Sequence, residues 1–304
     1  MAAITIEHIV KTYGKKKEVL ALNDISFNVG QGELFGLIGP DGAGKTSLFR
    51  VLTTLLLADS GNAAVDGFDV VKDYVQIRHR VGYMPGKFSL YPDLSVEENL
   101  NFFATIFNTS IKENYELIRD IYIQIEPFKK RRAGKLSGGM KQKLALCCAL
   151  IHRPSVLFLD EPTTGVDAVS RKEFWEMLKG LKQQGITILV STPYMDEADL
   201  CDRVALIQNG KILSINTPEG IVDSFSNPLW AVKSLHMLHL LNDLRQTAFV
   251  KAVYPFGEFH HIVMKDETGV PLLHDFMADH KNDNAVMQPV KPGIEDCFIA
   301  LMKI

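Results

Sequence analysis

Short apolar runs that end at glycine or aspartate recur along most of the chain. Residues 33–38 and 156–159 are almost wholly apolar, and residues 186–191 and 203–207 have the same character. Runs of this length without polar alternation are typical of strands that are buried on both faces of a sheet. We therefore predict four buried strands at these positions.

Between these runs, apolar side chains recur at helical spacing, at positions i, i+3, i+4 and i+7. Four segments have this pattern: residues 48–56, 100–107, 144–151 and 174–181. Ser95 and Glu98 form a capping box before the second of them. Cys147 and Cys148 fall on the third, which favours small buried side chains over a reactive pair. Alternation of strands and helices predicts an α/β fold with a largely parallel sheet.

The two ends of the chain depart from this alternation. Residues 4–10 and 25–29 predict an antiparallel piece at the edge of the main sheet. Asn227-Pro228 is typical of a linker. Beyond it we predict strands at 229–234, 248–254 and 258–265 and helices at 237–244 and 272–279. The chain thus divides into a domain of residues 1–227 and a small C-terminal α/β appendage of residues 228–304.

Composition and charge argue against several classes of protein. Apolar residues make up 46% and charged residues 23% of the 304 positions, as in ordinary globular proteins. The formal net charge of −3 gives no reason to expect a nucleic-acid partner. No apolar stretch approaches the roughly 20 residues of a membrane span, and no secretory signal is visible. Four cysteines without metal-ligand spacing indicate a reduced, cytoplasmic protein.

Two histidine pairs, His236/His239 and His260/His261, are close enough in sequence to raise the question of a metal site. Neither pair has a carboxylate or cysteine beside it at ligand spacing. We therefore expect surface or interface histidines.

Residues 39–46, Gly-Pro-Asp-Gly-Ala-Gly-Lys-Thr, fit the phosphate-loop pattern G-x-x-x-x-G-K-[ST]. They lie between a predicted strand and an amphipathic helix, which is the context that this pattern requires. The glycines let backbone amides point at phosphate oxygens, and the helix N-terminus adds its positive end. We expect Lys45 to reach the β- and γ-phosphates of a nucleotide and Thr46 to place its hydroxyl on Mg²⁺.

The predicted strand at 156–159 is followed by Asp160 and Glu161. Carboxylates at the end of a buried strand lie where the sheet edge meets a ligand. Asp160 suits the metal, and Glu161 suits a base that orients the attacking water.

Residues 136–142, Leu-Ser-Gly-Gly-Met-Lys-Gln, stand between these two motifs, and Asp167 follows them. This ordered series resembles the ATP-binding-cassette (ABC) family over about residues 2–225. The resemblance implies an ABC ATPase cassette with a phosphate-loop core sheet, an antiparallel edge sheet and a helical subdomain, with ATP and Mg²⁺ as cofactors. Ser137 is a good helix N-cap, and the next two glycines leave amides exposed as a second anion site.

In this family the second anion site covers the γ-phosphate that a second cassette holds. Tyr13 matches the aromatic residue on which adenine stacks, and Asp167 matches the loop that touches the partner cassette. The predicted catalytic residues are Glu161 and Lys45, and the predicted metal ligands are Thr46 and Asp160. The predicted nucleotide-binding residues are Tyr13, Gly39, Pro40, Asp41, Gly42, Ala43, Gly44, Lys45, Thr46, Ser47, Ser137, Gly138, Gly139 and Asp167.

Two positions depart from the family pattern. Gly86 stands where the family usually has a glutamine that feels Mg²⁺, and Pro193 stands where it usually has a histidine that contacts the γ-phosphate. Proline offers neither a side-chain donor nor a backbone N–H. Both departures fall on residues that sense the γ-phosphate, so reduced turnover is an open alternative.

The segment 194–198, Tyr-Met-Asp-Glu-Ala, resembles the drug- and polysaccharide-exporter branch of the family. This resemblance implies an ATP-hydrolysing subunit on the cytoplasmic face of the membrane, with a separate polytopic membrane subunit and a second cassette as partners. Two alternatives stay open. One is a regulatory cassette with weakened hydrolysis, paired with an unlike cassette. The other is a soluble ABC ATPase that acts on ribosomes or DNA.

Overall fold

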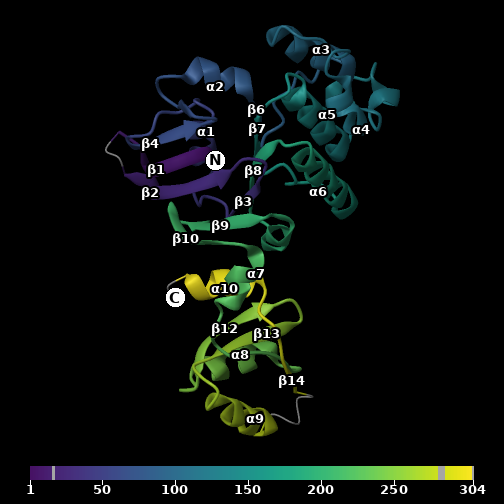
Figure 1. Cartoon of the computed structure of the whole chain (residues 1–304). Coiled ribbons are helices and arrows are strands. Elements are labelled where there is room, and N and C mark those ends of the chain that lie inside the picture. The colour runs from purple at the N-terminus through teal and green to yellow at the C-terminus, as the bar shows by residue number, and fades with distance from the viewer. Residues whose placement is uncertain (16–17, 280–284, 303–304) are drawn as a thin grey trace. The chain divides into compact units, whose positions relative to one another are not determined.

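Six strands form the central sheet, in the order β10-β9-β3-β8-β7-β6 (Figure 1). The computed structural model describes residues 1–15, 18–279 and 285–302. Neighbouring strands from β9 to β6 run parallel, and β10 is antiparallel to β9. The strands are β3 (Leu34–Ile38), β6 (Val81–Met84), β7 (Val156–Asp160), β8 (Thr187–Thr192), β9 (Arg203–Gln208) and β10 (Lys211–Asn216). Every residue of β3, β7 and β8 is buried, which confirms the predicted strands with two covered faces.

A second, antiparallel sheet has the order β2-β1-β4-β5. Its strands are β1 (Ala2–Tyr13), β2 (Val19–Gly30), β4 (Ser60–Val65) and β5 (Phe68–Asp69). Helix α1 (Lys45–Leu52) shares one apolar cluster with both sheets, in which Phe49 meets Phe158 of β7 edge-on. The predicted N-terminal strands are antiparallel as expected, but they belong to a separate sheet and not to the edge of the central one.

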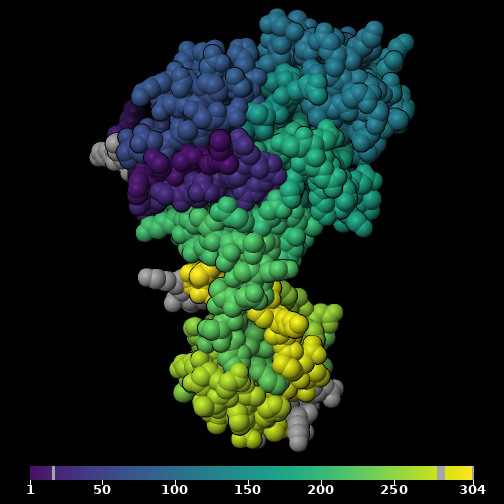
Figure 2. All heavy atoms as spheres, in the orientation of Figure 1, coloured from purple at the N-terminus to yellow at the C-terminus, as the bar shows by residue number. Residues whose placement is uncertain are grey.

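Helices α3, α4 and α5 gather on the side of the central sheet away from the antiparallel sheet (Figure 1). In the space-filling view they form a lobe of their own beside the strands of the antiparallel sheet (Figure 2). The capping box at Ser95 and Glu98 is present and begins α3 as predicted. The helical elements of this part are α2 (Tyr74–Arg80), α3 (Val96–Ile106), α4 (Tyr115–Tyr122), η1 (Glu126–Phe128), η2 (Ala133–Lys135), α5 (Gly138–Leu150), α6 (Ala168–Gln183) and η3 (Met195–Leu200).

Helix α1 is shorter than the helix predicted at 48–56. It ends at Leu52, because Thr54 adopts the left-handed backbone conformation, with φ at 62°, which a helix cannot accommodate. Leu55 is exposed as a result, whereas Leu56 still packs against the apolar cluster. The apolar spacing therefore reflects packing here and not a continuous helix.

The chain divides into two compact units, Met1–Pro218 and Glu219–Ile304, so the division falls before the predicted linker at 227–228. The second unit contains α7 (Pro218–Asp223) apart from its first residue, and also β11 (Leu229–Lys233), α8 (Met237–Arg245), β12 (Val250–Phe256), β13 (Phe259–Met264), α9 (Gly269–Asp279), β14 (Val286–Pro289) and α10 (Ile294–Leu301). Its antiparallel sheet has the order β12-β13-β11-β14. Together with the chain order β-α-β-β-α-β, this is the split βαβ arrangement of ferredoxin-like folds.

The histidines of the second unit correct one sequence prediction. His260 and His261 lie on β13 and are only 5% and 7% exposed, so they are not surface residues. His260 pairs with the carbonyl of Met237, and the Nδ1 atom of His261 lies 2.7 Å from the Oδ1 atom of Asp296. The carboxylate that the neighbouring sequence lacks thus comes from α10, a helix that the pattern did not predict.

Candidate nucleotide-binding site

The phosphate loop, residues 39–46, connects β3 to α1, and its backbone approaches other chain segments closely. A Cβ atom at Gly39 would lie 2.1 Å from the carbonyl oxygen of Ile207. Gly44 has φ at 108° and caps α1, and a Cβ atom there would lie 2.4 Å from the carbonyl oxygen of Ala21. Only glycine fits these positions, which explains the loop's composition.

Lys45 is 3% exposed, and its ammonium group points back into the loop. The Nζ atom donates to the carbonyls of Gly39 at 2.7 Å and Pro40 at 3.0 Å. It also lies 3.1 Å from the Oε1 atom of Glu161. The structure therefore brings the predicted catalytic lysine and glutamate into direct contact.

Asp160 ends β7 at the carboxyl edge of the sheet, and Glu161 follows it. Asp160 is 2% exposed, and its Oδ1 atom accepts a hydrogen bond of 2.7 Å from the hydroxyl of Ser191 on β8. The backbone of Glu161 has φ at 51°, in the left-handed region that non-glycine residues rarely adopt. Burial raises the pKa of nearby Tyr83 to about 12, and the charge of Asp160 adds to this effect.

Tyr13 lies at the end of β1, beside the phosphate loop. Its hydroxyl is 3.0 Å from the hydroxyl of Ser47 on α1, and 37% of the residue is exposed. The Nζ atom of Lys11 is 5.9 Å from the centroid of the Tyr13 ring. The role of Tyr13 as an adenine platform stays a prediction. Within the loop, Asp41 and Gly42 are exposed, whereas Pro40, Gly44, Thr46 and Ser47 are half-buried and Ala43 is buried.

The segment of Ser137, Gly138 and Gly139 begins α5. The hydroxyl of Ser137 accepts from the backbone N–H of Met140 at 3.4 Å, as an N-cap does, and Ser137 and Gly138 are exposed. A Cβ atom at Gly139 would lie 2.7 Å from the hydroxyl of Ser170 on α6, so glycine permits this close helix contact.

Asp167 caps the neighbouring helix α6. Its carboxylate accepts from the backbone N–H groups of Ser170 at 3.0 Å and Val169 at 3.1 Å. These hydrogen bonds, with that of Ser170 the largest, lower the pKa of Asp167. Asp167 is thus a fixed anionic cap at an exposed turn, where the family resemblance expects contact with a partner cassette.

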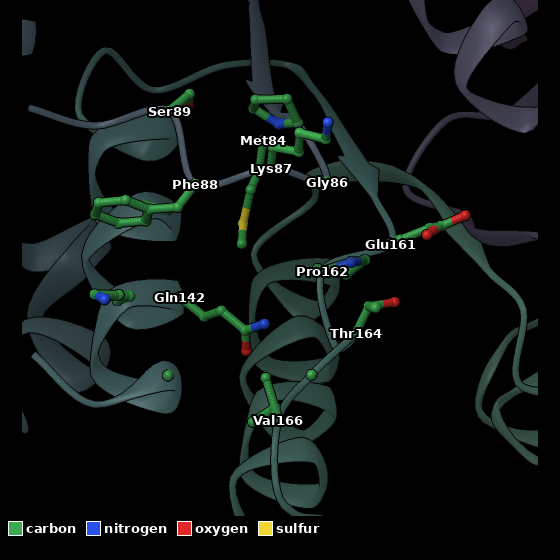
Figure 3. Close-up of a pocket in the computed structure, with 15 residues that line it drawn as sticks. Met84, Gly86, Lys87, Phe88, Ser89, Gln142, Glu161, Pro162, Thr164 and Val166 are labelled. Atoms are coloured by element: carbon green, nitrogen blue, oxygen red, sulfur yellow. The ribbon is translucent and has the colours of Figure 1, made fainter. Parts of the chain in front are cut away.

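A cavity of about 160 Å³ lies between the segment that follows β6, the start of α5 and the segment that follows β7 (Figure 3). Gly86 and Glu161 border it from two strand ends, and the side chain of Gln142 projects toward it from α5. A Cβ atom at Gly86 would lie 3.0 Å from the carbonyl oxygen of Asp160. Gly86 therefore lets the loop rest directly on the end of β7.

Residues 22–164 match the ABC transporter family. The probable multidrug ABC transporter ATP-binding protein YbhF of Escherichia coli K12 is 42% identical over 239 residues, which are 77% of this chain but only 41% of YbhF. The Nod factor export ATP-binding protein I of Burkholderia lata is 38% identical over 227 residues, which are 74% of each chain. The chain belongs to the ABC transporter family. The predicted ABC ATP-binding cassette of the exporter-like branch is confirmed.

Solved structures agree with this assignment. An ATP-binding subunit of an ABC transporter has a TM-score of 0.66 and 26% identity, and the match covers 73% of this chain and 93% of that one. The cbiO1 protein of Clostridium perfringens has a TM-score of 0.64 and 26% identity, with 73% and 91% covered. The predicted ABC ATPase fold is thereby confirmed. In the ranges that the structure describes, no helix has both the length and the apolar character needed to cross a membrane.

One residue of the site escaped the sequence reasoning. Ser191 follows an apolar run in the same way as Asp160, and the two are paired in register across β7 and β8. Its position at a parallel strand end was the available signal, but a serine there carries no motif.

Proposed function

We propose that this ABC cassette is the ATP-hydrolysing subunit of a membrane exporter and that it closes around ATP with a second cassette. The observation that carries the proposal is the convergence of the phosphate loop, Lys45 and Glu161 at one sheet edge, with 3.1 Å between the two charged groups. A nucleotide phosphate would bind the ammonium group of Lys45 in place of the Glu161 carboxylate. That exchange would release Glu161 to act on water.

The backbone of the phosphate loop would supply the remaining phosphate contacts. Its glycines leave amides free of side chains, and α1 begins at Lys45 with its positive end toward the loop. The ring of Tyr13, whose hydroxyl contacts that of Ser47 on α1, would stack on adenine.

The residues present also fit Mg²⁺. The hydroxyl of Thr46 and the buried carboxylate of Asp160 are hard oxygen ligands of the kind that Mg²⁺ prefers. Such an ion would neutralise charge on the β- and γ-phosphates. The contribution of the protein is to keep the Asp160 carboxylate dry and held in one orientation.

The second cassette would meet the exposed start of α5. Ser137 and Gly138 present backbone N–H groups to solvent, and Asp167 lies at a nearby exposed turn. Exposed amides at a helix N-terminus attract an anion. We therefore infer that these residues complete the ATP site of the partner cassette.

The membrane subunit would dock on an apolar groove of the helical lobe. The groove has a volume of about 380 Å³, and Leu55, Phe103 and Phe107 are among its lining residues. Phe88, Tyr91 and Phe102 are exposed in the adjoining segment. This segment, residues 88–107, is the one that we propose to receive a cytoplasmic loop of the transporter, at the cytoplasmic face of the membrane.

The docking proposal can be tested with cysteines placed at the exposed residues Ser89 and Asp93. The four native cysteines are all buried, so labelling will be selective. Crosslinks to a cytoplasmic loop of a co-expressed membrane subunit are expected. Crosslinks that stay within the cassette would contradict docking at this segment.

The class of cargo follows from the relatives alone. Their names refer to multidrug transport, doxorubicin resistance and Nod factor export. We propose export of a drug-like molecule, with selectivity residing in the membrane subunit. Purification of the cassette with that subunit in vesicles, followed by ATP-dependent uptake of a labelled drug, tests the proposal. No ATP-dependent transport and no change of ATPase rate in the complex would contradict it.

The regulatory alternative rested on Gly86 and Pro193. The comparisons do not favour it, since the relatives with printed functions are ATP-binding proteins of export and resistance systems. We therefore propose that this cassette hydrolyses ATP with its own Glu161.

A further inference from the structure

Ser191 forms hydrogen bonds with both acidic residues of the proposed ATPase site, Asp160 and Glu161. It is fully buried on β8, directly opposite Asp160 in the parallel register. The next residue, Thr192, accepts a hydrogen bond of 3.2 Å from the backbone N–H of Gly39, where the phosphate loop begins. Ser191 thus adjoins the Asp160–Glu161 pair, and the next residue contacts the start of the phosphate loop, yet Ser191 belongs to neither motif.

Three hydrogen bonds define what Ser191 does. Its hydroxyl donates to Oδ1 of Asp160 at 2.7 Å, while the backbone N–H of Glu161 donates to the same hydroxyl at 3.0 Å. The Glu161 N–H also reaches the carbonyl of Ser191 at 3.1 Å. The amide of Glu161 can only donate, so the hydroxyl accepts from it and directs its own proton to Oδ1 of Asp160.

This arrangement matters because of the backbone of Glu161. With φ at 51°, Glu161 occupies a region that persists only when its surroundings hold it there. The shared N–H bond to the hydroxyl and carbonyl of Ser191 is such a restraint. The resulting turn directs the Glu161 side chain toward Lys45.

We propose that Ser191 is a positioning residue that fixes both acidic groups of the site through one hydroxyl. It orients the Asp160 carboxylate for the metal and holds the Glu161 backbone in the turn that aims its side chain at the phosphate. The inference rests on the proposed ATPase function. It adds a residue that neither the phosphate-loop motif nor the family resemblance includes.

The first test replaces Ser191 by alanine, which keeps the packing but removes both hydroxyl bonds. ATP binding without Mg²⁺, measured by calorimetry in EDTA, should change less than about twofold. In a Glu161→Gln background, where turnover is blocked, the Mg²⁺ concentration for half-maximal enhancement of ATP binding should rise about 10-fold or more, as expected for a lost hydrogen bond to a charged group. In the parent background, kcat should fall by about 10- to 100-fold, with little change in KM.

The matched control is Thr187→Val. Thr187 is also buried on β8, and its hydroxyl accepts from the N–H of Gly32 at 2.9 Å, at the opposite end of the strand. This variant loses a buried hydroxyl bond without touching the site. Its Mg²⁺ dependence and kcat should therefore equal those of the parent protein, even where its melting temperature falls.

Ser191→Cys provides rescue, since a thiol of similar size is a weak donor and acceptor. We expect its Mg²⁺ dependence and kcat to lie between those of alanine and serine, and it keeps the test informative should the alanine variant misfold. The proposal is overturned if Ser191→Ala matches Thr187→Val in every readout and differs from the parent only in stability. Failure of the parent protein itself to bind or hydrolyse ATP would refute the proposed function instead.

Discussion

Asp160 of the cassette and Asp296 of the C-terminal unit are both almost wholly buried aspartates, at 2% and 1% exposure, yet their surroundings differ. Oδ1 of Asp296 accepts from the hydroxyl of Tyr254 at 2.8 Å and lies 2.7 Å from Nδ1 of His261. Its Oδ2 accepts from the N–H of Gly293 at 2.8 Å. Both oxygens of Asp296 are therefore engaged within its own unit.

Asp160 instead ends a parallel strand, and the next residue, Glu161, contacts Lys45 and lines a cavity. The one described hydrogen bond of Asp160 comes from another strand end and orients it. The difference shows that a buried carboxylate is not by itself a site. Asp296 ties α10 to its sheet through Tyr254 and His261, whereas Asp160 lies at the sheet edge where we propose that the nucleotide binds.

The largest expected effect is at Glu161, next to Asp160. Glu161→Gln keeps the shape of the side chain but removes the base, so ATP should bind while turnover falls by about 10²- to 10⁴-fold. A steady-state phosphate-release assay measures the loss, and gel filtration with ATP should show a stable dimer. Hydrolysis at the parent rate would remove Glu161 from its assigned role.

The counterpart on the other side of the comparison is Asp296→Ala. It leaves Tyr254 and His261 without their acceptor, so unfolding of the C-terminal unit should become about 3 kcal/mol easier. ATP affinity should be unchanged. Urea unfolding and calorimetry on the same variant separate the two properties. The neighbouring exposed Glu295, changed to alanine, serves as the control. A loss of ATP affinity in Asp296→Ala would break the distinction between the two acids.

His152 of the cassette, a half-buried histidine, extends the comparison to pH. His261 has a carboxylate partner, whereas His152 stacks on Phe107, and its buried Nδ1 atom has no hydrogen-bond partner among the residues that the structure describes. Burial lowers the pKa of His152 from 6.5 to about 4. Between these values the unfolded chain binds a proton that the folded chain refuses, so stability should fall as the pH drops from 6.5 to 4.

His152→Gln removes this titration and keeps a donor for the carbonyl of Val81, which His152 contacts at 3.0 Å. The melting temperature of the variant should therefore decline less steeply than that of the parent protein over this range. His239→Gln, at an exposed position, should leave the slope unchanged. If the melting temperatures of His152→Gln and the parent protein fall equally with pH, the lowered pKa of His152 is refuted as the cause.

The smallest effect is expected at Gly86. A Cβ atom there would meet the carbonyl of Asp160 at 3.0 Å, so Gly86→Ala should lower turnover by about two- to threefold through a small shift of β7. Gly86→Gln should be no better than Gly86→Ala, because it carries the same Cβ atom. A gain of tenfold or more with glutamine would show instead that the missing sensor limits hydrolysis.

Much of the cassette was predictable because its signals are local. The phosphate loop needs glycine at positions 39 and 44, because a Cβ atom at either would collide with a backbone carbonyl oxygen. The buried strands β3, β7 and β8 are recognisable in the sequence as apolar runs. The motifs therefore identified both the sheet edge and most of the residues that gather there.

The remainder depends on contacts between distant segments. Asp296 meets His261 across 35 positions of sequence, and no pattern around either residue indicates the other. Ser191 lies 31 positions from Asp160, and its role exists only because β7 and β8 are neighbours. The roles of Lys45, Thr46 and Glu161 toward ATP and Mg²⁺ stay predictions until ligands are measured.

The most direct test of the central claim is ATP binding by Lys45→Ala. Loss of a desolvated charge contact should cost about 2–4 kcal/mol, or about 30- to 1,000-fold in affinity. Titration calorimetry with ATP and Mg²⁺ measures it against the parent protein and against Lys72→Ala, which changes an exposed lysine of the same unit. Weakened binding in Lys45→Ala alone is the predicted result. Equal ATP affinity in all three proteins would contradict the account.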